Sequence, residues 1–563
     1  MTLLCVPIMV VDEDQAGADA TAARDAGADL VELRIDGFFT GPTDPDELRR
    51  EHDSVVRLVA DCPLPCIITC RIAAEGGHYD GPEDARIALY ERLGTAFGTL
   101  PDGRQESPPR YLDIEHAVYS RSANIRQKIH LAVEHPEQVR DLRTSLILST
   151  HDHHTRPSDL TRRVLAMRSH TAARILKIAW RARSLRDNLE LFDILAERDR
   201  PTIALGMGEF GLMSRILAPK FGGFLTFASL HRESTTAPGQ PTIADLISTY
   251  RFRAIKPTTL IHGIIAWPVS HSLSPRVHNL AFDELGHDRV YVPMPVAEGF
   301  ESFKATLLDL LHHPRLDLAG VSVSIPHKEN LSRLAREQHW TMDDIATAAG
   351  SANTLVVHRD SSGVVSGVSV HNTDASALLD ATHASLGSVT DMDIAIIGAG
   401  GLGRVAALVL ATASARVTIY NRSEDRGNAV VRGIIEMMQS VPHAQSHVPT
   451  AAAWHALADS AHDLYLNCTP LGMTGGPAPG ESPVCPADIA RRNPRAAFFD
   501  SVYAPVMTPM LQQAAAAGCR IITGPDMFAR QAEEQAKLWL GDVPAGLYPR
   551  LVRDAVASSG RDA

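Results

Sequence analysis

Short runs of apolar and β-branched residues recur along the first 230 positions, and most are followed by a stretch rich in helix-forming residues. The eight runs are LLCVPIMV (3–10), DLVELRID (29–36), PCIITCRI (65–72), YLDIEH (111–116), SLILSTHD (145–152), RILKIAW (174–180), PTIALGMG (201–208) and FLTFAS (224–229). Parallel strands buried on both faces read as continuous apolar runs, and strand–helix alternation indicates right-handed crossovers. Eight such units in about 250 residues predict a TIM (β/α)8 barrel over residues 1–250. A long doubly wound sheet is the alternative, but no glycine-rich nucleotide loop follows the first run.

Charged side chains stand at or near the carboxyl ends of these predicted strands. They are Glu32, Arg34, Arg71, Asp113, Glu115, His151 and Lys177. The carboxyl ends of barrel strands meet at one mouth, so we expect these groups to share a pocket. A lysine desolvated there can attack a ketone to form a Schiff base while His151 moves protons, although lysines more commonly reach out to the rim. Arg34, Arg71 and Arg215 offer paired hydrogen bonds to a carboxylate.

Six motifs in this half follow the order found in type I 3-dehydroquinate dehydratases. They are ELR (32–34), TCR…EGG (69–77), STHD (149–152), LKIA (176–179), GLMSR (211–215) and APGQ (237–240). The first half resembles that family throughout. The resemblance implies that Lys177 forms an imine with the C3 ketone of 3-dehydroquinate and that His151 is the general base and acid.

The same resemblance implies a set of residues that bind the substrate or, in the case of Glu75, support His151. They are Glu32, Arg34, Arg71, Glu75, Arg215, Thr236 and Gln240. Thr236 is a departure, because the bacterial members of the family have serine there. A hydroxyl is retained at this position.

A polar segment with one proline, RFRAIKPTTL (251–260), predicts a linker before a second strand–helix pattern begins. Shortly after it, Ser272 and Ser274 precede a predicted helix. Their hydroxyls and the free backbone N–H groups suit a hydroxylated carboxylate, and they equally suit an ordinary N-cap. Lys328 ends a later strand, and Asp374 follows another; taken singly, both residue types are most often solvated surface.

A stronger signal lies in DIAIIGAGGLGRVAALVLA (393–411), which reads as a strand, a GxGxxG loop and an alanine-rich helix. Glycines let the backbone turn tightly and approach a pyrophosphate at the helix N-terminus. The next strand ends at Asn421, where an NAD site would have an acidic residue for the ribose diol. Arg422 and Arg426 instead suit the 2′-phosphate of NADP, and a basic loop without a ligand is the alternative.

The second half resembles shikimate dehydrogenase over residues 258–545. The matching motifs are PVSHSLSP (268–275), VSVSIPHK (321–328), AGSANTL (349–355), HNTD (371–374), GAGGLG (398–403), NRS (421–423), NCTPLGM (467–473), FDSVY (499–503) and GPDMFARQAEEQAKLW (524–539). The resemblance implies that Lys328 and Asp374 are the catalytic pair, which handles the proton of the C3 hydroxyl of shikimate. Ser322 stands where many single-domain members have asparagine, whereas the plant fusion enzymes have serine.

Further site residues follow from this resemblance. Those implied to bind or adjoin shikimate, besides Asp374, are Ser272, Ser274, Ser324, Asn353, Tyr503 and Gln531. Those expected to bind NADP are Gly398, Gly400, Gly401, Gly403, Asn421, Arg422, Ser423, Arg426 and Gly524.

The two resemblances reinforce each other, because the product of the dehydratase, 3-dehydroshikimate, is the substrate of the dehydrogenase. We therefore predict a bifunctional α/β chain: the barrel, a substrate domain over 258–380 completed by C-terminal helices 525–555, and a Rossmann-like NADP domain over 381–524. Two alternatives remain open at this point. One half could be a catalytically silent scaffold, or the second half could be a quinate dehydrogenase that uses NAD.

Composition narrows the remaining classes. The 563 residues carry a formal net charge of −12, which argues against nucleic acid or an anionic membrane as the main partner. No apolar run approaches the ~20 residues of a membrane span, and the N-terminus reads as a strand rather than a signal peptide. The seven cysteines fit a reducing compartment, so we expect a cytoplasmic enzyme. The cysteine and histidine spacings predict no metal site, and the sequence does not distinguish a monomer from a homodimer.

Overall fold

The computed structural model describes residues 1–96, 98–100, 103, 105–134, 144–231, 239–270, 272–438 and 447–559. Thr236 lies outside the described residues. The chain forms two compact units, Met1–Thr259 and Leu260–Ala563. No helix in the described ranges is long and apolar enough to cross a membrane.

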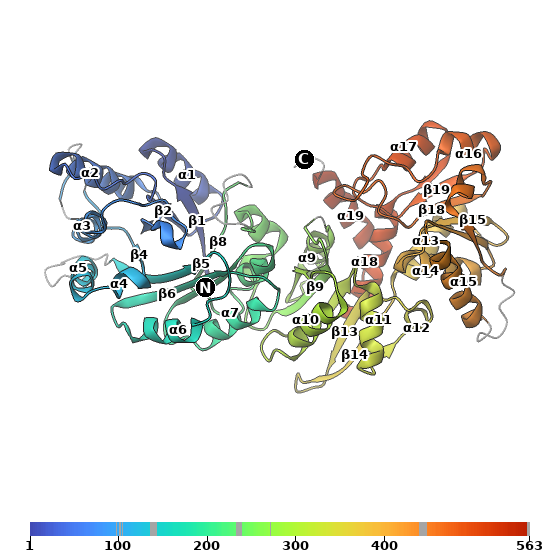
Figure 1. Ribbon diagram of the computed structural model, residues 1–563, viewed down its shortest axis with the longest axis horizontal. Coiled ribbons are helices and arrows are strands. Elements are labelled where there is room, and N and C mark those ends of the chain that lie inside the picture. The colour runs from blue at the N-terminus through green and yellow to red at the C-terminus, as the bar shows by residue number, and fades with distance from the viewer. Residues whose placement is uncertain are drawn as a thin grey trace. The chain divides into compact units, whose positions relative to one another are not determined.

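The first unit is an eight-stranded parallel barrel (Figure 1). Its strands are β1 (Leu3–Met9), β2 (Leu30–Arg34), β3 (Cys66–Thr69), β4 (Tyr111–Glu115), β5 (Ser145–Asp152), β6 (Ala173–Arg181), β7 (Thr202–Met207) and β8 (Leu225–Phe227). They follow chain order around the sheet, except that β8 pairs with β1. The circle is nearly closed between β7 and β8, where Phe224 N donates to Thr202 O at 2.8 Å. The predicted barrel is confirmed.

Helices follow most of the barrel strands. They are α1 (Glu13–Asp25), α2 (Pro45–Asp61), α3 (Glu83–Gly94), α4 (His116–Tyr119), α5 (Ala123–Glu134), α6 (Leu160–Ser169), α7 (Asp187–Ala196) and α8 (Leu212–Ile216). Helix α2 shows why they form: the side chain of Asp44 caps the backbone N–H groups of Asp46 and Glu47, and Pro45 occupies the first turn. Inside the barrel, alternate strand residues such as Ile67, Ile147 and Ile203 pack into one buried layer.

The segment predicted as a linker packs against the barrel. Phe252 and Ile255 are buried. Lys220 Nζ donates to the carbonyl oxygens of Pro257 at 2.8 Å and Thr259 at 2.9 Å. The chain therefore stays part of the first unit until Thr259.

The second unit contains two six-stranded sheets. The first has the order β10-β9-β11-β13-β14-β12. Its strands are β9 (Leu260–Ala266), β10 (Arg289–Pro295), β11 (Leu318–Val323), β12 (Thr341–Met342), β13 (Thr354–Arg359) and β14 (Val365–His371). The helices in this part of the chain are α9 (Ser274–Glu284), α10 (Phe300–His312), α11 (Lys328–Glu337), α12 (Asp344–Ala349) and α13 (Asp374–Leu386).

The other sheet is parallel and has the order β17-β16-β15-β18-β19-β20, so the direction of winding reverses between β15 and β18. Its strands are β15 (Asp393–Ile397), β16 (Arg416–Asn421), β17 (Thr450–Ala453), β18 (Leu464–Asn467), β19 (Ala497–Asp500) and β20 (Arg520–Ile522). Its helices are α14 (Gly401–Thr412), α15 (Glu424–Met438), α16 (Pro486–Arg492) and α17 (Pro509–Ala516). A winding reversal at the carboxyl ends of parallel strands is where doubly wound folds bind nucleotides.

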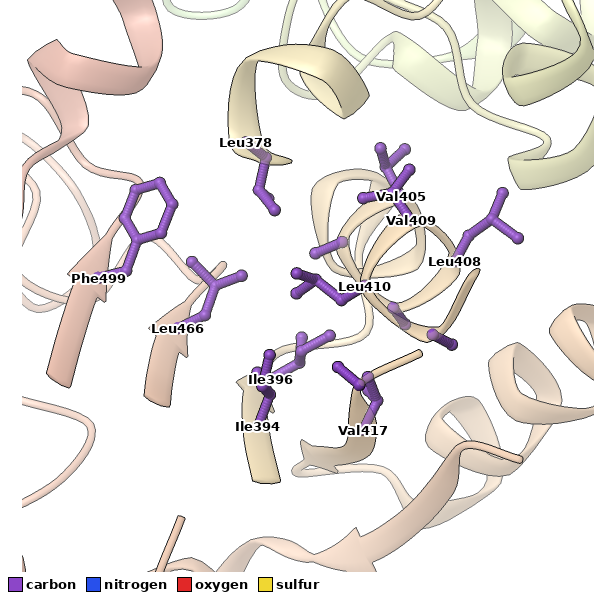
Figure 2. Packing of buried hydrophobic residues seen from close by; sticks show 14 of the residues in the cluster. Leu378, Ile394, Ile396, Val405, Leu408, Val409, Leu410, Val417, Leu466 and Phe499 are labelled. Atoms are coloured by element: carbon purple, nitrogen blue, oxygen red, sulfur yellow. The ribbon is translucent and has the colours of Figure 1, made fainter. Parts of the chain in front are cut away.

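The apolar face of α14 anchors this Rossmann-like sheet. Figure 2 shows Leu410 directed toward Ile396 of β15, with Leu466 and Phe499 on the neighbouring strands and Leu378 of α13 beside them. All five side chains are fully buried. The packing fixes the start of α14 relative to the strand ends, which positions the glycine loop between them.

Two long helices close the chain, α18 (Gly524–Leu540) and α19 (Leu547–Ser559). Ala532 and Leu551 from these helices share a buried cluster with Val277 and Ala281 of α9. Helix α18 also packs against β11 and β13, where Gln535 donates to Thr354 Oγ1 at 3.0 Å.

Candidate active sites

Lys177 lies inside the barrel on β6, where two carboxylates hold its side-chain nitrogen. Nζ donates to Glu32 Oε1 at 2.8 Å and to Asp113 Oδ2 at 3.0 Å, and it stands 4.5 Å from the centre of the Phe227 ring. The lysine side chain is only 7% exposed. The amine is therefore shielded from water and adjoins two groups that can accept its proton, as attack on a ketone requires.

Asp113 is also held by Arg71 and Ser149. Arg71 Nη2 lies 3.0 Å from Asp113 Oδ2, and Ser149 Oγ donates to Oδ1 at 2.6 Å. Burial alone would raise the pKa of Asp113, but the charges of Arg71 and Lys177 lower it to about 2. From the sequence, Asp113 was predicted only to be a charge at a strand end, and no role was predicted for Ser149. Both residues could have been identified from the sequence by their positions on the inward face of adjacent strands.

His151 projects from β5 on the same face as Ser149, whose Cα pairs with that of Lys177 across the sheet. Glu75 approaches it from a short 3-10 turn (Ala73–Glu75). Glu75 Oε2 accepts the backbone N–H of His151 at 2.9 Å and lies 3.0 Å from Nδ1. Burial and the neighbouring cations hold the pKa of His151 well below its usual value, so the imidazole is neutral. Its Nε2 is the nitrogen that remains to take a substrate proton.

The arginines of the first half differ in what they contact. Arg34 makes a two-pronged ion pair with Asp36, at 2.8 Å and 3.0 Å. Arg215 is buried, and within the described ranges no acidic partner is found for it and its Nε has no hydrogen bond. Burial lowers the pKa of Arg215 to about 10. Arg215 is thus the cation best placed to receive a carboxylate, and Gln240 is buried at the end of the adjoining loop.

In the second unit, Lys328 and Asp374 begin helices α11 and α13 and meet at their ends. Lys328 Nζ donates to Asp374 Oδ2 at 2.6 Å. The carboxylate is 2% exposed, and the N-terminus of α13 favours its charge. A cation and an anion in contact, both close to strand ends, form a pair that can pass a proton to or from a hydroxyl.

Asn353 lies beside this pair at the start of β13. Its Oδ1 accepts from Thr373 N at 2.9 Å and from Thr354 Oγ1 at 2.9 Å. Its Nδ2 is buried and finds no hydrogen-bond partner among the described residues. An unpaired buried donor is costly, so this amide is placed to bind an oxygen of a ligand.

The serines predicted to bind a carboxylate lie where α9 begins. Ser272 Oγ accepts the backbone N–H of Ser274 at 3.3 Å, but Leu273 occupies the N-cap position of α9 and no side chain caps the helix, so the alternative of an ordinary serine N-cap is wrong. Burial raises the pKa of Tyr503, against a hydrogen bond with Ser272, and its ring stacks on Phe528 of α18 at 5.4 Å. Half-buried side chains of Ser324 and Gln531 complete the residues predicted for this site.

Ser322 is part of a buried chain of hydrogen bonds beneath the site. Tyr291 Oη donates to Ser322 Oγ at 2.7 Å, and Ser322 Oγ donates to Gln535 Oε1 at 2.9 Å. Gln535 in turn donates to Thr354 Oγ1 at 3.0 Å. Neither Gln535 nor Tyr291 was predicted to take part in the site, because neither lies near Ser322 along the chain. This chain of hydrogen bonds gives the Ser322 hydroxyl both a donor and an acceptor, which explains why a serine fits at this position.

The glycine loop between β15 and α14 meets the requirements of a pyrophosphate cradle. Gly398 has a φ of +106°, a conformation that favours glycine, and a Cβ at Gly403 would lie 2.0 Å from Gly398 O. Gly400 faces open space, since a Cβ added there would have no atom within 4 Å. A Cβ on Gly401 would meet Ser351 Oγ at 2.9 Å, and one on Gly524 would meet Val502 O at 2.1 Å. The residues present therefore fit a dinucleotide at this loop.

The loop after β16 carries cations and no carboxylate at the strand end. Asn421 Oδ1 accepts the backbone N–H of Ala399 at 3.1 Å, so this side chain braces the glycine loop. Arg426 Nε donates to Ala399 O at 3.1 Å, whereas Arg422 and Ser423 are exposed. This arrangement fits the 2′-phosphate of NADP better than the free diol of NAD.

Comparison with known families agrees with this division of the chain. A family model described as type I 3-dehydroquinase matches residues 4–257, and one described as shikimate dehydrogenase substrate binding domain matches residues 264–355. A third, described as ketopantoate reductase PanE/ApbA, matches residues 394–474.

Individual relatives extend the comparison. The chain is similar to the shikimate dehydrogenase (NADP(+)) of Citrifermentans bemidjiense, with 36% identity over 51% of this chain and 91% of that protein. The solved dehydroquinate dehydratase and shikimate dehydrogenase from S. pombe AroM covers 99% of this chain and 98% of its own, with 22% identity and a TM-score of 0.40. The bifunctional 3-dehydroquinate dehydratase/shikimate dehydrogenase, chloroplastic, of Arabidopsis thaliana is 33% identical over 97% of this chain and 83% of that protein. The chain belongs to the family of bifunctional 3-dehydroquinate dehydratase/shikimate dehydrogenases.

Proposed function

We propose that Lys177 and His151 carry out the first of two consecutive reactions, the dehydration of 3-dehydroquinate to 3-dehydroshikimate, and that the second unit reduces this product to shikimate with NADPH. The single observation that carries the proposal is the buried Lys177 amine between Glu32 and Asp113, with His151 held by Glu75 on the adjoining strand. Family membership supports both activities.

In the barrel, the Lys177 amine attacks the C3 ketone and water leaves, which yields an imine that draws electrons from the neighbouring carbon. His151 removes a proton at C2 through Nε2 and returns it to the departing C1 hydroxyl, which leaves as water. Glu75 holds the ring by its contact with Nδ1. Arg215 and Gln240 bind the substrate carboxylate, and hydrolysis of the product imine regenerates Lys177.

In the second unit, bound NADPH supplies a hydride, and this chain supplies the proton and the orientation. Lys328, paired with Asp374, donates a proton to the carbonyl oxygen that becomes the C3 hydroxyl. Ser272, Ser274 and Tyr503 hold the carboxylate, while the unpaired amide of Asn353 binds a ring hydroxyl. The glycines at 398–403 receive the pyrophosphate, and Arg422 with Ser423 receives the 2′-phosphate.

One assay tests the whole scheme. The full-length chain receives 3-dehydroquinate and NADPH, and absorbance at the nicotinamide band is followed. NADPH consumption with 3-dehydroquinate alone, with shikimate and not quinate as the product, requires both activities. If NADPH is consumed only after 3-dehydroshikimate is added, the barrel is catalytically silent. If quinate and NAD support faster turnover than shikimate and NADP, the second activity is a quinate dehydrogenase. A cytoplasmic location and the oligomeric state stay predictions for fractionation and sizing experiments.

A further inference from the structure

A groove with a cavity volume of about 610 Å³ lies in the second unit among helices α11, α12, α14 and α15. The four helices lie next to one another in Figure 1. The lining does not include the glycine loop at 398–403 or the residues 421–423 after β16. The groove is therefore a different opening from the dinucleotide cradle, which it adjoins where Glu329 lies 3.5 Å from Arg426, and its lining also excludes Lys328 and Asp374. Its volume is within the ~300–1,000 Å³ range of small-molecule sites.

The lining of the groove contains three arginines and one acidic residue, Glu329. Arg336 is exposed on α11 and forms no ion pair among the described residues. Arg404 Nη2 is 3.8 Å from Glu329, and its Nε is buried without a hydrogen-bond partner among the described residues. Arg333 is held in place by stacking on the Phe300 ring, with Cζ 3.6 Å from the ring centre. Arg333 is also paired with Glu337 at 3.2 Å, so the excess positive charge of the groove is that of Arg336, and its unsatisfied donor is Arg404 Nε.

The opposite wall is apolar. It is formed by Ala348 and Ala349 of α12 and by Val430 and Ile434 of α15. Gly433 leaves this wall open, since no atom lies within 4 Å of where a Cβ would be. A ligand that fills the groove must therefore combine anionic oxygens with a flat apolar body.

We propose that this groove is a second ligand site, which binds a phosphate monoester of a ring compound. The phosphate lies between Arg336 of α11 and Arg404 of α14, where it satisfies the Arg404 Nε–H and displaces the long contact with Glu329. The ring lies on the α12 and α15 wall. Guanidinium groups match phosphate oxygens in two-pronged hydrogen bonds, which favours phosphate over a single carboxylate. The ligand would join helices from both sheets of this unit.

Phenyl phosphate is the simplest probe with this chemistry. The full-length protein, saturated with NADP so that the cofactor loop is filled, is titrated with phenyl phosphate by isothermal calorimetry. We expect one binding event per chain that Arg336→Ala weakens by about tenfold or more, because it removes a charge-assisted contact. Arg404→Ala should weaken the same event, and inorganic phosphate should bind more weakly than phenyl phosphate because it lacks the ring.

Arg432→Ala is the matched control, since Arg432 is an exposed arginine of α15 that does not line the groove. Its affinity for phenyl phosphate should equal that of the unmodified protein. Thermal melting of each variant excludes a loss of fold as the cause. Absence of any binding event at NADP saturation would overturn the proposal, and so would equal affinities in the Arg336→Ala and Arg432→Ala proteins.

Discussion

Glu75 and His151 are joined by two contacts: one carboxylate oxygen accepts the backbone N–H at 2.9 Å and lies 3.0 Å from Nδ1 of the ring. The pair fixes both the position of the imidazole and the nitrogen that faces the substrate. Because both side chains are largely shielded from water, with about 10% of each exposed, their ionisation is tied to folding as well as to catalysis.

The pH dependence of stability should report Glu75. Burial raises the pKa of Glu75 to about 7, whereas the unfolded carboxyl titrates near 4.5. Between those values the folded state holds more protons, so the free energy of unfolding falls as pH rises, by an amount on the order of 3 kcal/mol. Glu75→Gln has no titrating carboxyl at this position, so its stability does not fall in this way as pH rises. We therefore expect urea unfolding at a series of pH values to show that the free energy of unfolding of Glu75→Gln rises relative to that of the unmodified protein between about pH 4.5 and about pH 7. A constant difference between the two proteins over that range would contradict the assignment.

Lys177 should be the nucleophile of the dehydratase. Borohydride added with 3-dehydroquinate should attach a stable adduct to Lys177, which peptide mass spectrometry locates. Lys177→Ala should abolish dehydratase activity and leave shikimate oxidation intact, and full dehydratase activity in this variant would exclude the mechanism. The variant also leaves Glu32 without the Lys177 cation, whereas Asp113 keeps Arg71 at 3.0 Å, so a destabilisation of at most ~3–5 kcal/mol is expected in the melting control.

His151→Ala separates imine formation from proton transfer. The variant should still form the borohydride adduct, because Lys177 is intact, but its turnover should fall by ~10²–10⁴. Quenched single-turnover experiments measure both quantities. An adduct that no longer forms would mean that His151 is needed for attack on the ketone itself.

Arg422 should set the preference for NADP. Arg422→Ala should raise the KM for NADP by roughly tenfold to a hundredfold and leave that for NAD nearly unchanged, because charge-assisted contacts contribute ~1.5–3 kcal/mol each. Steady-state shikimate oxidation with each cofactor measures the effect, and Arg432→Ala serves as the control for a lost surface charge. Equal changes with both cofactors would show that Arg422 does not contact the 2′-phosphate.

The boundary between the two halves can be tested by expressing fragments of the chain that end at different residues. Fragments 1–259 and 260–563 should each retain one activity, since the contacts of the chain divide there. A first fragment that ends at residue 255 should be less stable, because Lys220, which is 5% exposed, loses the carbonyls of Pro257 and Thr259. Thermal melting compares the two first fragments, and equal melting temperatures would contradict this role of Lys220.

The sequence predicted the barrel well because its strands are buried on both faces and leave continuous apolar runs. RILKIAW (174–180), for example, falls within β6 (Ala173–Arg181). Alternation along the strands also put His151 and Lys177 on one face. The sequence pattern could not predict that Arg34 pairs with Asp36, because the direction of an arginine fork depends on side-chain geometry. Nor could it join Ser322 to Gln535, which lies 213 positions further along the chain.

The pairing of β8 with β1 has a consequence for synthesis on the ribosome. Leu3 and Leu4 are made more than 200 positions before Leu225 and Thr226, which cover one edge of their strand. Until then the nascent barrel is an open sheet with an exposed strand edge, a known template for wrong pairing. A pause in translation before residue 225 would prolong that exposure, whereas one after Thr259 would allow the first unit to close before the second appears. We therefore expect slow translation before residue 225 to lower the yield of correctly folded barrel, and slow translation after Thr259 to leave it unchanged.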